Sequence, residues 1–179
     1  MKQTKNGAWK VRSVVADTGP LLHLSEINNL SLLKVFSNIY MPNLIHLELK
    51  SYGISIAKLQ KTGVLNIQTV NADANEINKV FKRTRDYKVN HADISTIAVA
   101  NEKKIPLVLT DDLQLRKAIE SYGLKPVGTI GVIIKAYREN IIGSKELLLK
   151  TINKLFEQSS LFISPAFKSF TLEMVKRLK

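Results

Sequence analysis

Residues 13–24 read SVVADTGPLLHL, an apolar run that meets an acidic residue and then continues with a helical pattern. The valine-rich segment Val11–Ala16 predicts a short strand. Gly19-Pro20 opens a helix, because apolar residues recur at three-residue spacing from Leu21 to Ile27. We therefore expect Asp17 just past the C-terminal end of a buried strand.

The same alternation of strand and helix continues along the chain. Further strands are expected at 39–41, 64–70, 105–110 and Val127, and helices at 30–36, 43–50, 74–85, 93–103, 114–121 and 128–140. This order predicts a three-layer α/β/α fold with a central parallel sheet. Two more helices follow Lys145, so we expect an α/β domain at 11–145 and a helical C-terminal extension at 146–179, packed on it or on a partner.

Composition and net charge indicate which partners, which chemistry and which location to expect. The net charge of +12 favours an anionic partner, which is a nucleic acid, a membrane surface or an acidic protein. The absence of cysteine excludes disulfides and thiolate chemistry. The leader MKQTKNGAWKVR lacks the apolar core of a signal peptide, and no run approaches the ~18 apolar residues of a membrane span, so we expect a cytoplasmic protein with no membrane contact.

Further acidic residues follow the other predicted strands. Asp111 and Asp112 come directly after strand 105–110, Asp93 lies in the first turn of its helix, and Glu48 lies on the helix after Pro42. Ligands of parallel α/β sheets bind at the carboxyl ends of the strands. We therefore expect these acids to gather with Asp17 at one edge of the sheet.

Carboxylates gathered in this way repel one another unless a cation neutralises them. Their hard oxygens favour Mg²⁺ or Mn²⁺, which bind phosphate groups and activate water in nucleases. Asp111 and Asp112 cannot both point inward on alternating faces. The T-x-D spacing from Thr110 favours Asp112 as the metal ligand, with Asp111 assisting. As single residues, Asp93 and Glu48 have an alternative explanation, because acids near helix N-termini are stabilised by the helix dipole without any catalysis.

Asp17-Thr18-Gly19 also matches the Asp-Thr-Gly signature of aspartic proteases. Those enzymes need two such aspartates sharing a proton, and this chain has one. A dimer could supply the second, and the stretch IIGS, 141–144, is similar to one in retroviral proteases. Proteases of that kind are all-β, whereas this chain alternates strand with helix. We interpret the match as a coincidence.

Four stretches in order, VVADTGPLLHL, MPNLIHLEL, HADISTIAVA and LVLTDDLQLRKAI, are together similar to the PIN-domain family, the fold of VapC-like toxin ribonucleases. The stretch 122–142, with its GTIG segment, further resembles a PIN subgroup with a G-T-x-G helix after the last core strand. The resemblance covers roughly residues 13–145 and makes the 11–145 domain PIN-like.

The resemblance implies a metal-dependent endoribonuclease. Asp17, Glu48, Asp93, Asp111 and Asp112 would be the catalytic acids, with Asp17, Asp93 and Asp112 holding Mg²⁺ or Mn²⁺ and Thr18 and Thr110 as supporting hydroxyls. It further implies RNA as substrate and, for a toxin of a toxin–antitoxin pair, a small antitoxin protein that covers the site; homodimers are common in the family.

One departure from the subgroup pattern supports an alternative function. Where the subgroup has Gly-Glu-x-Glu, this chain has Ala92-Asp93-Ile94-Ser95, which shortens one acid and removes another. The alternative is a non-catalytic PIN module that binds nucleic acid or a protein partner.

The remaining polar residues leave open choices. Lys82, Arg83, Arg85 and Lys88 either contact an RNA backbone, with Tyr87 as a stacking surface, or form a solvated helix face. Arg116 either clamps a phosphate or orients Asp112. His23, His46 and His91 lack metal-ligand spacing, so we expect them to be structural or surface residues. The last helix, from Ser164-Pro165, carries an apolar stripe of Phe167, Phe170, Met174, Val175 and Leu178 that packs on the domain or forms a dimer or partner surface.

Overall fold

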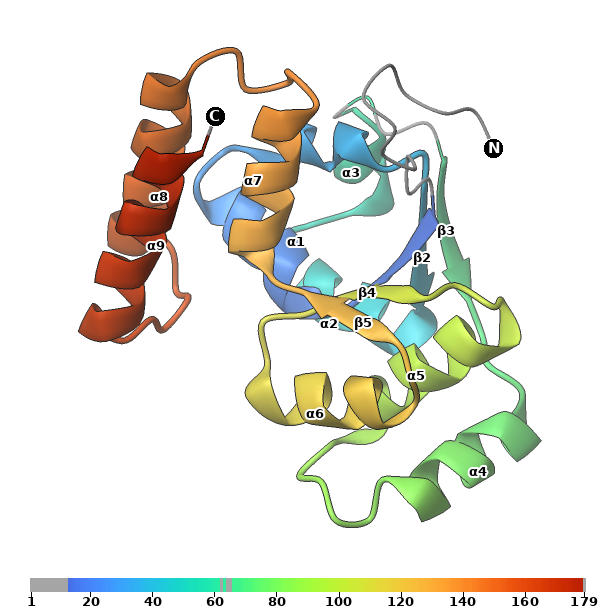
Figure 1. Ribbon diagram of the computed structural model, residues 1–179. Coiled ribbons are helices and arrows are strands. Elements are labelled where there is room, and N and C mark those ends of the chain that lie inside the picture. Colours follow the sequence, from blue (N-terminus) through green and yellow to red (C-terminus); the bar gives the residue numbers. More distant parts are fainter. Residues whose placement is uncertain (1–12, 62, 64–65, 179) are drawn as a thin grey trace.

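A single parallel sheet forms the centre of the computed structural model, which describes residues 13–61, 63 and 66–178 (Figure 1). Its strands are β1 (Ser13–Ala16), β2 (Asn38–Pro42), β3 (Asn66–Val70), β4 (Leu107–Leu109) and β5 (Lys125–Val127). Their order is β3-β2-β1-β4-β5, with every neighbouring pair parallel. The predicted parallel α/β fold is confirmed. The predicted strand residues Val11, Arg12, Val64 and Leu65 lie outside the described residues, as do both ends, 11 and 179, of the predicted domain scheme.

Helices cover both faces of the sheet, because its side chains alternate between two cores. Val14 and Ala16 point into one core and Val15 into the other, as the pleat requires. The first core is closed by α1 (Thr18–Glu26), the 3₁₀ helix η1 (Leu30–Val35), α2 (Asn43–Ser51), α3 (Ile56–Gln60) and α7 (Thr129–Arg138). The second is closed by α4 (Ala74–Arg83), α5 (His91–Glu102) and α6 (Leu113–Ser121).

The C-terminal helices form a layer of their own at one side of the molecule (Figure 1). The helix α8 (Lys145–Gln158) packs on α1 and α7, and α9 (Pro165–Arg177) packs on α8. The predicted apolar stripe of α9 is divided, because Val175 is fully buried while Phe167 and Phe170 are 50% and 62% exposed. None of the described helices is long and apolar enough to cross a membrane.

Two short helices add detail to the predicted elements. Leu30–Val35, predicted as helical, is a 3₁₀ helix, since Asn28, at φ 56°, follows the end of α1 and only a short connection remains before β2. The helix α3 was not predicted. Ser55 is its N-cap, and the Ser55 side chain accepts a hydrogen bond from Lys58 N.

The strand order reverses between β1 and β4. β1 leads outward through β2 and β3 on one side, whereas β4 and β5 lie on the other. In sheets of this kind the crevice outside the carboxyl ends of the two strands at the reversal is the usual ligand site. Asp17 follows β1, and Asp111 and Asp112 follow β4, so the chain places acids at this position.

Candidate active site

Asp17 lies at the reversal point and is bound from both adjoining strands. Its backbone N–H donates to the Leu109 carbonyl at 2.9 Å, which continues the β1–β4 pairing by one residue. Its Oδ1 accepts from Thr18 N at 2.7 Å and caps α1, and its Oδ2 accepts from the Thr110 hydroxyl at 2.8 Å. The residue is only 8% exposed. The Asp17 carboxyl is therefore held in one orientation by groups from two chain segments.

Burial dominates the electrostatics of Asp17. The pKa of this carboxyl is raised from 3.8 to about 7. Burial is the largest cause and the nearby charges of Asp93 and Glu48 also raise the pKa, while the bonds from Thr110 and Thr18 act in the opposite direction. A carboxylate here is consequently costly in the absence of a positive charge.

Asp93 enters the same neighbourhood from α5. Asn90 caps this helix by accepting from Ala92 N and Asp93 N, and Asp93 Oδ2 accepts in return from Asn90 N at 2.8 Å, which completes a capping box. Burial raises the pKa of Asp93, and the charges of Asp112 and Glu48 add to this, whereas the Asn90 bond lowers it. The helix thus begins at His91 rather than at Asp93 as predicted.

Glu48 and Asp112 complete the acidic group from opposite sides. Glu48, on α2, accepts a hydrogen bond from the Thr18 hydroxyl at 2.5 Å. Asp112 is the N-cap of α6, and its Oδ1 accepts from Gln114 N and Leu115 N, both at 2.7 Å. Both acids are exposed. Thr18 and Thr110, predicted as supporting hydroxyls, each bind one of these four acids.

The donor chemistry of this group fits a hard divalent cation. Glu48, Asp93 and Asp112 each use one oxygen in the bonds above, and the other accepts no hydrogen bond from the part of the chain that the structure describes. Oxygen ligands are those that Mg²⁺ and Mn²⁺ prefer. In the side-chain positions observed, however, no three histidine, cysteine or acidic residues among those described converge closely enough to hold a metal ion.

Asp111 lies apart from the other acids. Its oxygens accept hydrogen bonds from Thr129 N, the Thr129 hydroxyl and His23 Nδ1, and its charge is not among those that raise the pKa of Asp17 or Asp93. Of the five predicted acids, the structure therefore brings Asp17, Glu48, Asp93 and Asp112 together and turns Asp111 toward α1 and α7.

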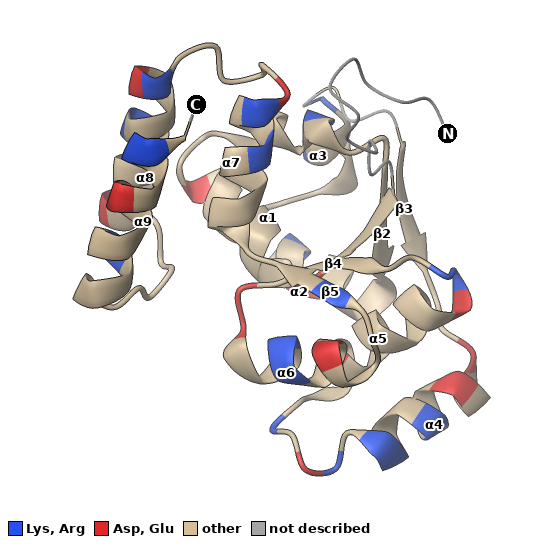
Figure 2. Cartoon of the chain, viewed as in Figure 1, with Lys and Arg blue, Asp and Glu red and all other residues tan. Residues whose placement is uncertain are grey.

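Four of the predicted basic residues, Lys82, Arg83, Arg85 and Lys88, are exposed and lie on α4 and the loop that follows it (Figure 2). Lys82 and Lys88 make no hydrogen bond, ion pair or ring contact with the described part of the chain. Arg83, in contrast, donates to the Ser121 carbonyl at 2.6 Å and lies over the Tyr122 ring at 4.3 Å. Arg85 lies 5.9 Å from the centre of the Phe81 ring. Arg116, on α6, reaches the Thr110 carbonyl at 3.4 Å rather than Asp112.

Two features of the site were not predicted from the sequence. Asn90 caps α5, and the spacing of Asn90 and Asp93 is a capping-box signal that could have been found. The partnership of His23, Asp111 and Thr129 joins residues distant in sequence and leaves no local pattern. Ser95, where the resemblance predicts an acid, donates to the His91 carbonyl at 2.9 Å.

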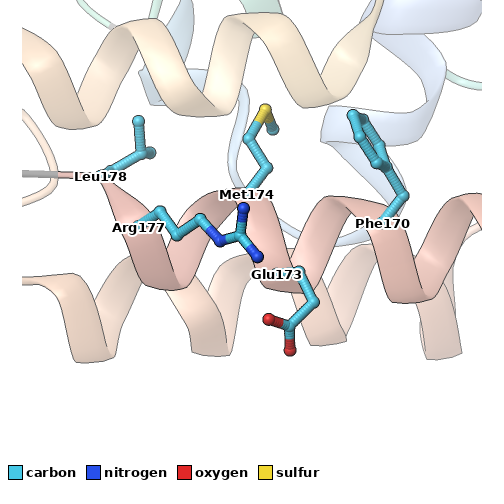
Figure 3. Close-up of a pocket in the computed structure, with 5 residues that line it drawn as sticks. All are labelled: Phe170, Glu173, Met174, Arg177 and Leu178. Carbon is cyan, nitrogen blue, oxygen red and sulfur yellow. The ribbon is translucent and has the colours of Figure 1, made fainter.

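A separate groove lies on α9, lined by Phe170, Glu173, Met174, Arg177 and Leu178 (Figure 3). Phe170, Met174 and Leu178 point to the same side of the helix there. All five lining residues come from the C-terminal helix and its end, and none is one of the acids described above.

The geometry defines a class of protein, namely a parallel α/β domain with an acidic site at the point of strand-order reversal. The chain matches the family model DUF3368, a PIN domain, over residues 13–177. The protein therefore belongs to this PIN-domain family, as its sequence resemblance predicted. A comparison with curated proteins found no match.

Proposed function

We propose that this PIN domain is a Mg²⁺- or Mn²⁺-dependent endoribonuclease. Asp17, Asp93 and Asp112 are the proposed metal ligands, and Glu48 is the fourth acid of the site. The proposed reaction is hydrolysis of an RNA phosphodiester, in which the oxygen of a water molecule forms a bond to phosphorus as a P–O ester bond breaks.

The observation that carries this proposal is the mutual repulsion of acids from four separate elements. The pKa of Asp17 is raised by burial and by Asp93 and Glu48, and that of Asp93 by burial, Asp112 and Glu48. A group of this kind is unfavourable in a domain without a cationic ligand, and carboxyls with strongly perturbed pKa values are concentrated at functional sites. A bound Mg²⁺ or Mn²⁺ supplies the missing positive charge, holds a substrate phosphate and activates water.

Two sets of hydrogen bonds within the chain hold the proposed ligands in place. The capping bonds of Asp93 and Asp112 engage one oxygen of each carboxylate and leave the second without a hydrogen bond from the described residues, so it is available to a cation. The Thr110 hydroxyl accepts from Asp112 N at 3.1 Å and donates to Asp17, which couples the positions of two proposed ligands.

Two features support RNA as the substrate, beside the family resemblance. The net charge of +12 favours a polyanion. Lys82, Arg85 and Lys88 are exposed around the loop that leads into α5 and Asp93, so they are the proposed backbone contacts. Arg83 and Arg116 are weaker candidates, because both already bind backbone carbonyls of the protein.

The test is cleavage of end-labelled structured RNAs with Mn²⁺, Mg²⁺ or EDTA, comparing wild type with Asp17→Asn. Asparagine can still cap α1, so the variant is expected to fold. Asp73→Asn is the matched control, since Asp73 is also the N-cap of a helix, α4, but is not one of the four acids of the site. Metal-dependent cleavage that is lost in Asp17→Asn and kept in Asp73→Asn supports the proposal; cleavage that survives in Asp17→Asn contradicts it.

The role of toxin in a toxin–antitoxin pair, with an antitoxin partner and a homodimer, stays a prediction from the resemblance. Growth arrest on induced expression, present for wild type and absent for Asp17→Asn, tests the toxin role. Light scattering of the purified protein tests the dimer.

A second candidate is a non-catalytic PIN module that binds nucleic acid or a protein. It is favoured by the observation that no three potential ligands among the described residues converge as a formed metal site. Saturating RNA binding without cleavage, unchanged by EDTA and by Asp17→Asn, would support this function instead.

A further inference from the structure

A second polar cluster lies beside the acidic group, and Asp111 is its centre. Asp111 Oδ1 accepts from Thr129 N at 2.8 Å, and its Oδ2 accepts from the Thr129 hydroxyl at 2.5 Å and from His23 Nδ1 at 2.9 Å. Thr129 is fully buried, and the His23 and Asp111 side chains are 10% and 13% exposed. Three elements meet in these bonds, namely the β4–α6 connection, α1 and the first turn of α7.

Gly128, the first glycine of the GTIG stretch, makes room for this contact. Gly128 is the N-cap of α7 and has no side chain to cap the helix, so Asp111 provides the capping oxygen from another segment. A Cβ at Gly128 would lie 2.6 Å from Asp111 Oδ1, and one at Gly131 would lie 2.7 Å from a Val127 methyl. The start of α7 is therefore shaped to receive the Asp111 carboxylate.

The same carboxylate touches the first turn of α1. The Cβ position of Gly19 is 3.5 Å from Asp111 Cβ and 3.6 Å from the His23 ring. A carboxylate can only accept hydrogen bonds, so the proton between the two side chains is on His23 Nδ1. This bond therefore fixes both the ring orientation and the nitrogen that carries the proton.

We propose that Asp111 is a positioning residue for the active site and not a metal ligand. It ties α1, which begins after Asp17, and α7 to the connection that carries Asp112, and so sets the distance between two proposed ligands. The catalytic part of this inference rests on the proposed nuclease function. Its structural part does not.

The sharpest variants are at Thr129, because this fully buried residue can reach neither substrate nor metal. Thr129→Val removes only the hydroxyl that binds Asp111, and Thr129→Ser keeps it. At a temperature where all variants are folded, Thr129→Val and Asp111→Asn are expected to lower kcat about tenfold with KM little changed, since small misplacements of reacting groups cost this much. Thr129→Ser is expected to retain wild-type kcat. Unchanged kcat in folded Thr129→Val and Asp111→Asn would overturn the positioning role.

Two further measurements do not depend on cleavage. Titration with Mn²⁺ alone is expected to show binding weakened by about tenfold for Asp111→Asn, which loosens the placement of two proposed ligands, and weakened more strongly for Asp17→Asn, which removes a ligand. In the imidazole nitrogen NMR spectrum, wild-type His23 is expected to carry a proton on Nδ1, and in Asp111→Asn to lose it, since the amide then donates to that nitrogen.

The outcomes separate this inference from the proposed function. If Asp111→Asn weakens Mn²⁺ binding as strongly as Asp17→Asn does, Asp111 is a ligand and the inference is wrong. If His23 Nδ1 carries no proton in the wild type, the bond to Asp111 is not as described and the inference is also wrong. A third outcome is that Asp17→Asn binds Mn²⁺ like wild type while wild-type His23 carries its proton on Nδ1. In that case the proposed metal site is wrong, and the structural role of Asp111 in joining α1 and α7 is retained.

Discussion

Replacing Asp17 by asparagine should stabilise the metal-free protein at alkaline pH while it abolishes activity. The Asp17 carboxyl is buried at the ends of β1 and β4, and its pKa is raised from 3.8 to about 7, with burial as the largest cause. Keeping this group ionised is therefore unfavourable in the folded state. Asparagine has nearly the same shape, is never charged, and can still accept the bond from Thr18 N.

The size and direction of the effect follow from the two pKa values. Below pH 3.8 the carboxyl is protonated in both the folded and the unfolded protein, so its burial causes no loss in the free energy of unfolding there. Between pH 3.8 and about 7 the unfolded chain has released a proton that the folded chain retains, and the free energy of unfolding falls as pH rises. Above about 7 the loss is complete and amounts to about 4 kcal/mol. Subtracting about 1 kcal/mol for the weakened Thr110 bond, we expect Asp17→Asn to be about 3 kcal/mol more stable than wild type at pH 8.

Urea unfolding in EDTA at pH 8 and pH 4 measures this difference. At pH 4 the advantage of Asp17→Asn should disappear, because the wild-type carboxyl is then largely protonated when folded. Asp73→Asn again serves as control, since Asp73 is an exposed N-cap for which the same change should alter stability little at either pH. A variant at Asp17 that is no more stable than wild type at pH 8, or equally shifted at both pH values, would refute the burial argument.

Three other changes have expected outcomes. Asp112→Asn and Asp112→Ala should both lose cleavage. Only Asp112→Ala should also lower the free energy of unfolding, by about 1 kcal/mol in urea titrations, because it removes the α6 cap; equal stability of the two variants would count against the cap. Gly128→Ala should lower the free energy of unfolding by about 1–3 kcal/mol, because the new methyl group would meet Asp111. Gly143→Ala should be nearly neutral in the same assay, because, among the described residues beyond its chain neighbours, no atom lies within 4 Å of the position its methyl group would take. A neutral Gly128→Ala would disprove the close approach of Asp111 to Gly128. Lys82→Ala should reduce by about 1 the slope of the logarithm of the RNA-binding constant against the logarithm of salt concentration. Arg83→Ala should instead lower the free energy of unfolding by about 1 kcal/mol, because its bond to the Ser121 carbonyl is lost; the reverse pattern would contradict these roles.

The sequence was sufficient for the fold and for the position of most acids. Apolar runs at strand spacing, separated by helical patterns, predict a parallel sheet, and in such a sheet every strand ends at the same edge. Asp17 and Asp112 could therefore be placed near each other although they are far apart in the chain.

The direction of individual side chains was beyond local patterns. Asp111 and Asp112 are neighbours of the same type, yet Asp111 is turned away by Thr129 and by His23, which is 88 positions distant in sequence. Arg83 and Arg116, which the sequence offers as phosphate contacts, donate to the carbonyls of Ser121 and Thr110. Such choices depend on tertiary packing, and no window of sequence contains both partners.

Short elements were missed for a related reason. The five-residue helix α3 and the 3₁₀ form of Leu30–Val35 are too short for periodicity to define them. Their form depends on the connections they bridge between α1, β2 and β3.

The most direct test of the proposed metal-dependent site is to locate Mn²⁺ by anomalous scattering in crystals of the wild-type protein and of Asp17→Asn. We predict a peak bounded by carboxylate oxygens of Asp17, Asp93 and Asp112 in the wild type, reached by small side-chain rotations, and no peak in the variant. A peak at Asp111 and His23, or no peak at the acidic group in protein that cleaves RNA with Mn²⁺, would contradict the proposed site.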